Sequence, residues 1–170
     1  MKQNVVISSF LPSQWQEYRD LRLSALKDSP DAFGSTFAES ALIPDSKWRL
    51  RLEQVRPDRD LPMVAMVDAE RVGLGWATIE KPETDVAHLY QMWVRPEFRA
   101  RGIGQSLVAS AVAWARKHTV GTLVLQVTCG NEPAIKLYKS MGFETIGAPV
   151  PLRPGSDLLE WIMQLNLDPG

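Results

Sequence analysis

The chain has 170 residues, of which 45% are hydrophobic and 23% are charged. This length predicts one domain over residues 1–170, and the composition excludes disordered, collagenous and coiled-coil proteins. Nineteen basic and 20 acidic residues give a net charge of −1 without a Lys/Arg-rich block, so we expect no nucleic-acid partner. The only cysteine, Cys129, has no disulfide partner in the chain, and no Cys/His cluster predicts a metal site.

No targeting or membrane segment is recognisable. Residues 1–10 lack the uninterrupted apolar core of a signal peptide, and no run approaches the roughly 18 apolar residues of a membrane span. We therefore expect a soluble protein in the reducing cytoplasm, with no membrane partner.

The first half of the chain predicts helices and an antiparallel hairpin. Its elements are a strand over 5–10, a helix from 13 to 28, a loop with a short helix over 31–44, a helix over 45–55, and strands over 63–67 and 72–79. Ser13 and Gln16 resemble a capping box at the start of the first helix, and Ser29-Pro30 ends that helix. The turn over 68–71 joins the two strands.

The second half alternates strands and helices. Its elements are a strand over 87–94, a helix over 104–118, a strand over 122–128, a helix over 132–141, and closing strands over 144–152 and 158–165. This order predicts two parallel strands joined by a crossover helix. The stripe expected to face the sheet contains Ile103, Leu107, Ala111, Trp114 and Ala115. We therefore predict a mixed α/β sheet, antiparallel early and parallel in the middle.

The turn before the crossover helix carries Arg-x-x-Gly-x-Gly at residues 99–104. Glycines at a helix N-terminus let backbone N–H groups and the helix dipole face an anion such as phosphate, and Arg99 and Arg101 add charge-assisted donors. A P-loop is excluded because Gly-Lys-Ser/Thr is missing, and the dinucleotide fingerprint because Leu107 replaces its third glycine. Taken alone, the pattern fits a phosphate site and a closely packed helix start equally well.

A second motif begins directly after the next predicted strand. Residues 131–143 read Asn-x-x-Ala-x-x-Leu-Tyr-x-x-x-Gly-Phe, with Asn131 as N-cap, Pro133 in the first turn and Gly142 as C-cap. The two motifs together, in this order and spacing, resemble the GNAT superfamily of acyl-CoA-dependent N-acyltransferases. The resemblance covers residues 87–143, and Ser-Pro-Asp-Ala-Phe-Gly-Ser-Thr at 29–36 is also similar to bacterial members.

The resemblance implies an α/β (α+β) fold: a mixed, splayed sheet of about seven strands flanked by about four helices. Two central parallel strands would separate, with the pantetheine arm of acetyl-CoA, the implied co-substrate, bound between them. Trp93 and Val94 would bind this arm through their backbone, and Asn131 would contact it or cap its own helix. The pyrophosphate would lie on the backbone of Arg99, Ala100, Arg101, Gly102, Ile103 and Gly104, with Gln105 nearby.

Tyr138 and His88 are the candidate catalytic residues. By helical spacing alone Tyr138 would be a core aromatic, but the resemblance places its phenol near the thioester sulfur, as general acid or as a hydrogen-bond donor. Some relatives carry a catalytic glutamate six residues before the strand-ending valine, where this chain has His88. We predict that His88 shares a strand face with Tyr90, Met92 and Val94. An imidazole can accept the amine's proton at neutral pH, although a structural histidine and a water chain are the alternatives.

Aromatic residues are the candidates for an acceptor pocket: Phe33, Trp48, Tyr90 and Trp76. We expect most of the six tryptophans to lie in the core or at the contact of a homodimer. Cys129 has no activating partner in the sequence and is interpreted as an ordinary small side chain, not a nucleophile.

These observations predict an enzyme, an N-acetyltransferase that moves the acetyl group of acetyl-CoA directly to a primary amine in a ternary complex. The acceptor, a small molecule or a protein amine, has no readable sequence code. A non-catalytic acyl-CoA-binding sensor or interaction module is the alternative. Tyr138 favours the enzyme, because an acid at the sulfur has no use in sequestration.

Overall fold

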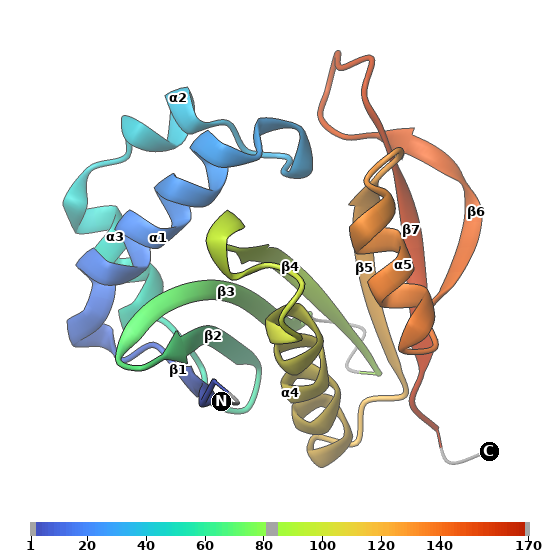
Figure 1. Ribbon diagram of the computed structural model, residues 1–170, viewed down its shortest axis with the longest axis horizontal. Helices are drawn as coiled ribbons and strands as arrows, with labels where there is room; N and C mark the ends of the chain where they lie inside the picture. The colour runs from blue at the N-terminus through green and yellow to red at the C-terminus, as the bar shows by residue number, and fades with distance from the viewer. Residues whose placement is uncertain (1–2, 81–84, 169–170) are drawn as a thin grey trace.

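Seven strands form one open sheet in a computed structural model that describes residues 3–80 and 85–168 (Figure 1). The strands are β1 (Val5–Ser9), β2 (Asp60–Val67), β3 (Glu70–Ile79), β4 (Val86–Val94), β5 (Thr122–Thr128), β6 (Glu144–Pro151) and β7 (Leu159–Asn166). Their order in the sheet is β1-β2-β3-β4-β5-β7-β6. Only β4 and β5 are parallel; every other neighbouring pair is antiparallel. The predicted mixed sheet is confirmed.

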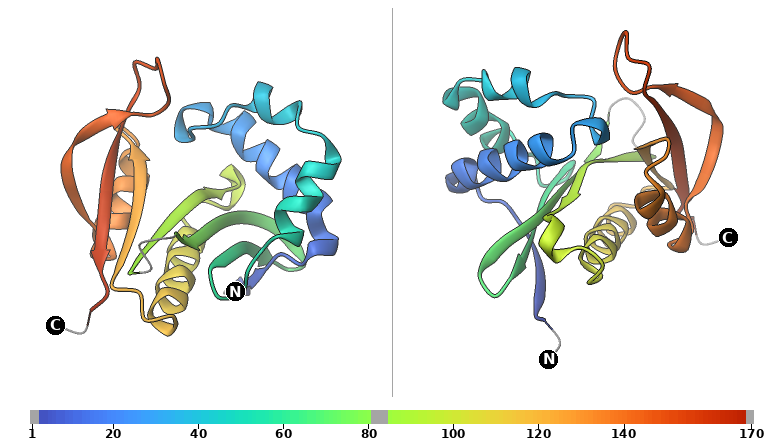
Figure 2. Two further views of the ribbon diagram at one scale, coloured as in Figure 1. Left: turned by 180° about the vertical axis from the view of Figure 1, so that it is seen from behind. Right: turned by 45° about the horizontal axis from the view of Figure 1, so that its top comes forward.

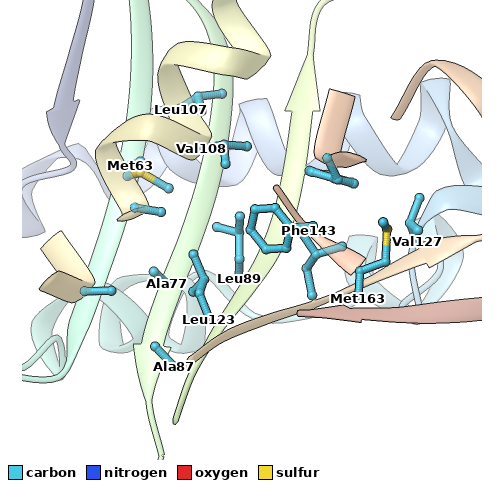
Figure 3. Packing of buried hydrophobic residues seen from close by; sticks show 14 of the residues in the cluster. Met63, Ala77, Ala87, Leu89, Leu107, Val108, Leu123, Val127, Phe143 and Met163 are labelled. Carbon is cyan, nitrogen blue, oxygen red and sulfur yellow. The ribbon is translucent and has the colours of Figure 1, made fainter. Parts of the chain in front are cut away.

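The described residues form five α-helices, of which four cover the two faces of this sheet (Figures 1 and 2). The five helices are α1 (Trp15–Asp28), α2 (Phe37–Ala41), α3 (Asp45–Glu53), α4 (Ile103–Lys117) and α5 (Glu132–Ser140). Helices α1 and α3 pack on one face and α4 and α5 on the other, so each face has its own hydrophobic core. Helix α2 lies against α1. In Figure 3, Leu89, Leu123 and Phe143 lie together in the core that α4 and α5 cover.

Two local predictions in the first half were wrong. The predicted capping box of Ser13 and Gln16 does not form, because Ser13 lies within a 3₁₀ turn, Pro12–Gln14, that precedes α1. The N-cap of α1 is Gln14, whose side chain makes no cap bond to α1 and accepts instead from the Leu11 backbone N–H at 2.8 Å. The β2–β3 turn contains two residues and not four, because Asp68 and Ala69 both have positive φ, 49° and 68°. Two such residues match the right-handed twist of the strands, so β3 begins earlier, at Glu70.

The parallel pair β4–β5 separates partway along its length. Val86–Leu89 is in register with Thr122–Leu125, and beyond those four rungs the two strands are no longer paired. The gap that opens lies between two half-sheets, β1-β2-β3-β4 and β5-β7-β6 (Figure 1). Helix α4 connects β4 to β5 on one face of the sheet, and α1 covers β4 on the other. The predicted splayed sheet is confirmed.

A bulge in β4 changes which side chains face each core. Gln91 has φ 60°, and the β3–β4 register shifts between Leu74 and Trp76. An extra residue in one strand reverses the alternation beyond it. Before the bulge, Leu89 packs in the α4/α5 core; after it, Met92 packs there and Trp93 packs in the α1/α3 core. The predicted common face of His88, Met92 and Val94 is therefore wrong.

Candidate active site

The gap between β4 and β5 contains a cavity of about 500 Å³. Tyr138 and Ala134 of α5 line it from one face of the sheet, and Arg22 of α1 and Phe33 line it from the other. The remaining lining residues are Ala32, Gly34, Ser35, Trp76, Thr78, Leu89, Tyr90, Gln91, Met92, Gln126, Val127, Thr128, Asn131, Leu152 and Glu160. A cavity reached from both faces can receive two substrates that meet inside the sheet.

The end of β4 presents backbone groups to this gap. Gly73 lies opposite Val94, and the Arg95 N–H donates to the Val72 carbonyl at 2.7 Å. In an antiparallel pair, this register directs the N–H and C=O of Val94 away from β3 and toward the gap. The same pattern turns the backbone polar groups of Trp93 toward β3. Its indole is buried and donates to the Asp28 carboxylate at 3.0 Å.

The turn before α4 has six consecutive free amides. The N–H groups of residues 100–105 donate no hydrogen bond to another described residue, and the ladder begins with the Ser106 N–H bonding to the Gly102 carbonyl at 3.0 Å. Ala100 and Gly102 have φ of 61° and 81°, which lets the turn present its amides outward. Donors without partners at the positive end of a helix dipole form a ready anion site.

The arginine side chains of this turn point elsewhere. Arg99 donates to the Val94 carbonyl at 2.9 Å and to Asp28 at 2.7 Å, and the Arg101 guanidinium lies 5.1 Å from the Phe98 ring centroid. Arg99 therefore braces the turn against β4 and α1, and the expected free donor from its side chain is not seen. The anion site consists of the backbone.

Gly104 and Asn131 position helices α4 and α5. A Cβ added to Gly104 would lie 3.1 Å from a Leu137 methyl group, so glycine permits close packing of the two helices. Asn131 caps α5 through its Oδ1, which accepts from the Ala134 N–H at 3.4 Å, and it also lines the cavity. Gln105 is exposed on the first turn of α4.

Tyr138 projects from α5 into the cavity wall. Its ring packs edge-on against Phe143, with centroids 5.8 Å apart. Burial raises the pKa of the Tyr138 phenol to about 12, and the hydroxyl donates no hydrogen bond to another described residue. Tyr138 is therefore a protonated donor available to a ligand at neutral pH.

His88 is not among the residues that line the cavity. It lies on the part of β4 that is still paired with β5, stacked on Tyr90 with ring centroids 5.7 Å apart. Its Nε2 is 3.9 Å from a Glu80 carboxylate oxygen, and Glu80 also accepts from the Tyr90 hydroxyl at 2.9 Å. His88 thus contacts the cavity wall through Tyr90, without facing the cavity itself.

The aromatic candidates separate into two groups. Phe33, Tyr90 and Trp76 line the cavity, whereas Trp48 is 1% exposed and packs against Tyr18 in the α1/α3 core. Trp48 was predicted from composition alone, which cannot distinguish a core tryptophan from one in a pocket. It is a core residue.

Two ionisable side chains in the cavity wall were missed by the sequence analysis. Arg22 lies within the apolar stripe of α1, four residues after Tyr18 and four before Leu26, where a charge is anomalous. Glu160 lies opposite Thr128 on β7, and burial raises the pKa of its carboxyl group. No local signal indicated Glu160, because its position depends on β7 pairing with β5.

The loop between α1 and α2 is tied across the gap. The Arg153 guanidinium donates to the carbonyls of Pro30, Phe33 and Gly34 at 3.0, 2.8 and 3.3 Å, and Thr128 donates to the carbonyl of Asp31. These bonds join the α1 half of the molecule to β5 and the β6–β7 loop. They hold Phe33 at the cavity.

Known proteins match this chain in sequence and fold. The pattern of the acetyltransferase (GNAT) family matches residues 15–143. An L-methionine sulfoximine/L-methionine sulfone acetyltransferase of Pseudomonas aeruginosa is 30% identical over 150 residues, covering 82% of this chain and 85% of the relative. An uncharacterized N-acetyltransferase of Methanocaldococcus jannaschii is 36% identical over 105 residues. The match covers 58% of this chain and only 45% of that relative. The chain likewise spans only 44% of the length of two mycothiol acetyltransferases that it matches.

Solved structures share the fold at low identity. A GNAT acetyltransferase of Streptococcus pneumoniae has a TM-score of 0.82 at 19% identity, covering 97% of this chain and 100% of the other. A putative acetyltransferase of Salmonella typhimurium, solved with acetyl-CoA, has a TM-score of 0.80 at 18% identity and covers 98% and 96%. Within residues 3–80 and 85–168, no three potential metal ligands cluster and no helix is long and apolar enough to cross a membrane.

Proposed function

Because the chain belongs to the acetyltransferase (GNAT) family, we propose that it transfers the acetyl group of acetyl-CoA to a primary amine. One observation carries this proposal: the cavity inside the sheet joins the face that bears Tyr138 to the face that bears Arg22. Acetyl-CoA would enter from the α4/α5 face and the amine from the α1 face. Direct transfer in a ternary complex then needs no covalent enzyme intermediate.

The donor half-site is made mainly of backbone. The free amides of residues 100–105 would bind the pyrophosphate, and Val94 would bond the pantetheine through its gap-facing C=O, which has a second lone pair beside the bond from Arg99. Asn131, which lines the cavity, would contact the same arm while capping α5. Gln105 would lie beside the phosphates. This arrangement fits acetyl-CoA used as a substrate.

The chemical step is an acyl transfer. The amine nitrogen attacks the thioester carbonyl carbon, and a backbone N–H at Val94 stabilises the oxyanion that forms. Collapse of this intermediate breaks the C–S bond, and the Tyr138 hydroxyl donates its proton to the departing thiolate. A pKa of about 12 keeps this proton on Tyr138 at neutral pH.

Two groups compete to accept the proton of the attacking amine. His88 occupies the strand position predicted from the sequence, but it reaches the cavity only through Tyr90. Glu160 lines the cavity, and its raised pKa makes it a stronger base than an exposed carboxylate. The cavity lining supports Glu160 as the base, and substituting each of the two residues in turn separates their roles.

The test is release of free coenzyme A from acetyl-CoA in the presence of a panel of amines, with the acetylated product identified by mass. The Pseudomonas relative and the N-acetylaspartate synthetases carry names of amino-acid acceptors, so amino acids belong on the panel beside polyamines, peptides and aminoglycosides. Tight acetyl-CoA binding with no thiol release for any amine would instead establish the non-catalytic binding module.

We also propose that the protein is cytoplasmic and forms a homodimer. The single, unpaired cysteine is consistent with a reducing, cytoplasmic location. A homodimer is tested by sedimentation velocity.

A further inference from the structure

Arg22 is a buried cation in the wall of the cavity. It extends from the middle of α1, is 6% exposed, and its guanidinium carbon lies 4.5 Å from the centroid of the Phe33 ring. Phe33 is itself held in place by the bond from Arg153 to its carbonyl. The Arg22 guanidinium therefore packs on a ring whose own position is held by a hydrogen bond.

No described residue neutralises this charge. Neither a carboxylate within 4 Å nor a hydrogen-bond acceptor is found for Arg22, and its Nη1 is fully buried without a partner. Burial lowers its pKa to about 10, and the nearby Arg51 adds repulsion. An isolated buried charge is expensive unless something pairs with it.

The other arginines behave differently. Arg19, Arg56, Arg95 and Arg99 each pair with a carboxylate, and Arg153 donates to three carbonyls. Arg59 and Arg71 each have one buried nitrogen without a partner, but both side chains are half-exposed and neither lines the cavity. Arg22 alone combines burial, lack of a partner and a place in the cavity among the described arginines.

Arg22 also lies on the side from which the amine would enter. It packs with Phe33 in the α1/α3 layer, while Tyr138 lies on the opposite face of the sheet. Arg22 is the only cationic side chain lining the described cavity, where Glu160 is the only anionic one. One guanidinium matches one carboxylate, since its paired N–H groups fit two carboxylate oxygens; a phosphate dianion would call for a second cation.

We propose that Arg22 binds the carboxylate of the acceptor, so that the amine substrate is a free amino acid. This inference rests on the proposed acetyl transfer and narrows its acceptor class. A free α-amino acid carries its carboxylate on the carbon that bears the amine, whereas a polyamine has no carboxylate and a lysine side chain in a protein has none next to its amine. The apolar surface of Phe33, Trp76 and Tyr90 would then contact the amino-acid side chain.

The test compares L-amino acids with their carboxamides, which keep the amine and the side chain but lack the negative charge. For the preferred amino acid, we expect wild-type kcat/KM to exceed that of its amide by on the order of 100-fold. In Arg22→Met, which keeps most of the volume, this ratio should fall to about one. Arg22→Lys keeps the charge but not the paired donors, so it should retain part of the ratio.

Arg49→Met is the matched control, because the Arg49 guanidinium also packs on an aromatic ring, 5.0 Å from the Trp15 centroid, but outside the cavity. It should keep the wild-type ratio. If Arg22→Met does not fold, the proposal is tested by comparing the acid-to-amide ratio of kcat/KM in the wild type with that in Arg22→Lys. Equal rates for acids and amides in the wild type, or an unchanged ratio in the Arg22 variants, would overturn the proposal.

A binding measurement separates this inference from the proposed function. Calorimetry in the presence of coenzyme A uses the N-acetyl forms of the same amino acids and of their amides as probes. Arg22-dependent binding of the acids without any acetyl transfer would support the carboxylate site and reject the activity. Acetyl transfer to amides and polyamines, with no Arg22-dependent binding of acids, would do the reverse.

Discussion

Arg99 and Asp28 are 71 positions apart, and the Arg99 guanidinium donates to the Asp28 carboxylate at 2.7 Å. The same carboxylate accepts from the Trp93 indole at 3.0 Å and from the Ser29 hydroxyl at 2.8 Å. One side chain at the end of α1 thus connects the acceptor-side helix, strand β4 and the turn with free amides. The two proposed half-sites share this contact.

Asp28→Asn should weaken both stability and donor binding. Burial opposes ionisation of Asp28, but the bonds from Trp93, Ser29 and Arg99 outweigh it and lower its pKa. The contribution is therefore present above the unfolded-state pKa of about 4 and is lost as pH falls through the lower folded-state value. Since both partners are partly exposed, we expect a loss of about 1 kcal/mol at pH 7 in urea unfolding.

The loss from Asp28→Asn should shrink toward pH 3, and KM for acetyl-CoA should rise as the turn loosens. Asp20→Asn is the control, because Asp20 also accepts from an arginine, at 3.0 Å, but is 67% exposed and remote from the turn. Equal losses in the two variants would show that Asp28 has no special role.

Gly102→Ala should reduce acetyl-CoA affinity beyond its cost in stability. A side chain at φ 81° is strained by about 1 kcal/mol, although open space surrounds this glycine. Gly155→Ala provides a matched control, with φ 76° and equally open surroundings in the β6–β7 turn. Both variants should lose similar unfolding free energy, and calorimetry should show weaker acetyl-CoA binding for Gly102→Ala alone. Unchanged affinity in that variant would remove the phosphate role of the turn.

Tyr138→Phe should impair chemistry and leave binding and folding intact. Loss of the acid should lower kcat by roughly 10²–10⁴, while the edge-on contact with Phe143 remains. Because the hydroxyl has no partner among the described residues, the free energy of unfolding should change by less than about 1 kcal/mol. With a pKa of about 12, Tyr138 should produce no alkaline loss of kcat in the wild type below about pH 10. A wild-type rate in Tyr138→Phe would reduce this tyrosine to packing.

Glu160→Gln and His88→Gln identify the base. If Glu160 takes the amine's proton, its substitution should remove the acid limb of the kcat/KM profile and slow transfer, and His88→Gln should leave both in place. The opposite pattern would assign the role to His88, as the sequence suggested. Identical profiles in all three proteins would mean that water removes the proton.

Arg22→Met should stabilise the protein without ligand. Removing an unpaired buried cation should raise the free energy of unfolding by about 1 kcal/mol in urea titration, despite the lost contact with Phe33. Arg49→Met should show no such gain. Destabilisation of Arg22→Met would mean that the ring contact outweighs the desolvation of the charge.

The local structure of the proposed donor half could be predicted because it is encoded in contiguous motifs. Residues 99–104 and 131–143 encode a turn, a cap and a helix face by local rules, and helices α4 and α5 begin within one residue of the predicted positions. The long-range contacts of Arg99 with Asp28 and of Arg101 with Phe98 have no such local signal. The bulge at Gln91 could not be predicted, since an extra residue in β4 is defined only against its partner β3. That single residue invalidated the predicted face of Met92.

The acceptor half depends on tertiary pairing, and sequence reasoning fell short there. Glu160 reaches the cavity only because β7 inserts between β5 and β6, and Arg153 closes the loop over residues 30–34 from more than 100 positions away. Arg22 was the exception. A charge in the apolar stripe of α1 was visible in the sequence, and it should be treated as a signal whenever a helix faces a substrate cavity.

The four-rung pairing of β4 and β5 leaves two bare strand edges facing each other inside one molecule. Such edges are templates for further strands, and most proteins keep them covered. On the proposed function, the amides of the pantetheine arm complete the sheet as a short third strand would, which is β-augmentation by a small molecule. Amide hydrogen exchange measures whether the ligand covers this edge. The Val94 amide should exchange freely without ligand and become protected with acetyl-CoA, whereas the Arg95 amide, which is bonded to β3, should stay protected in both states.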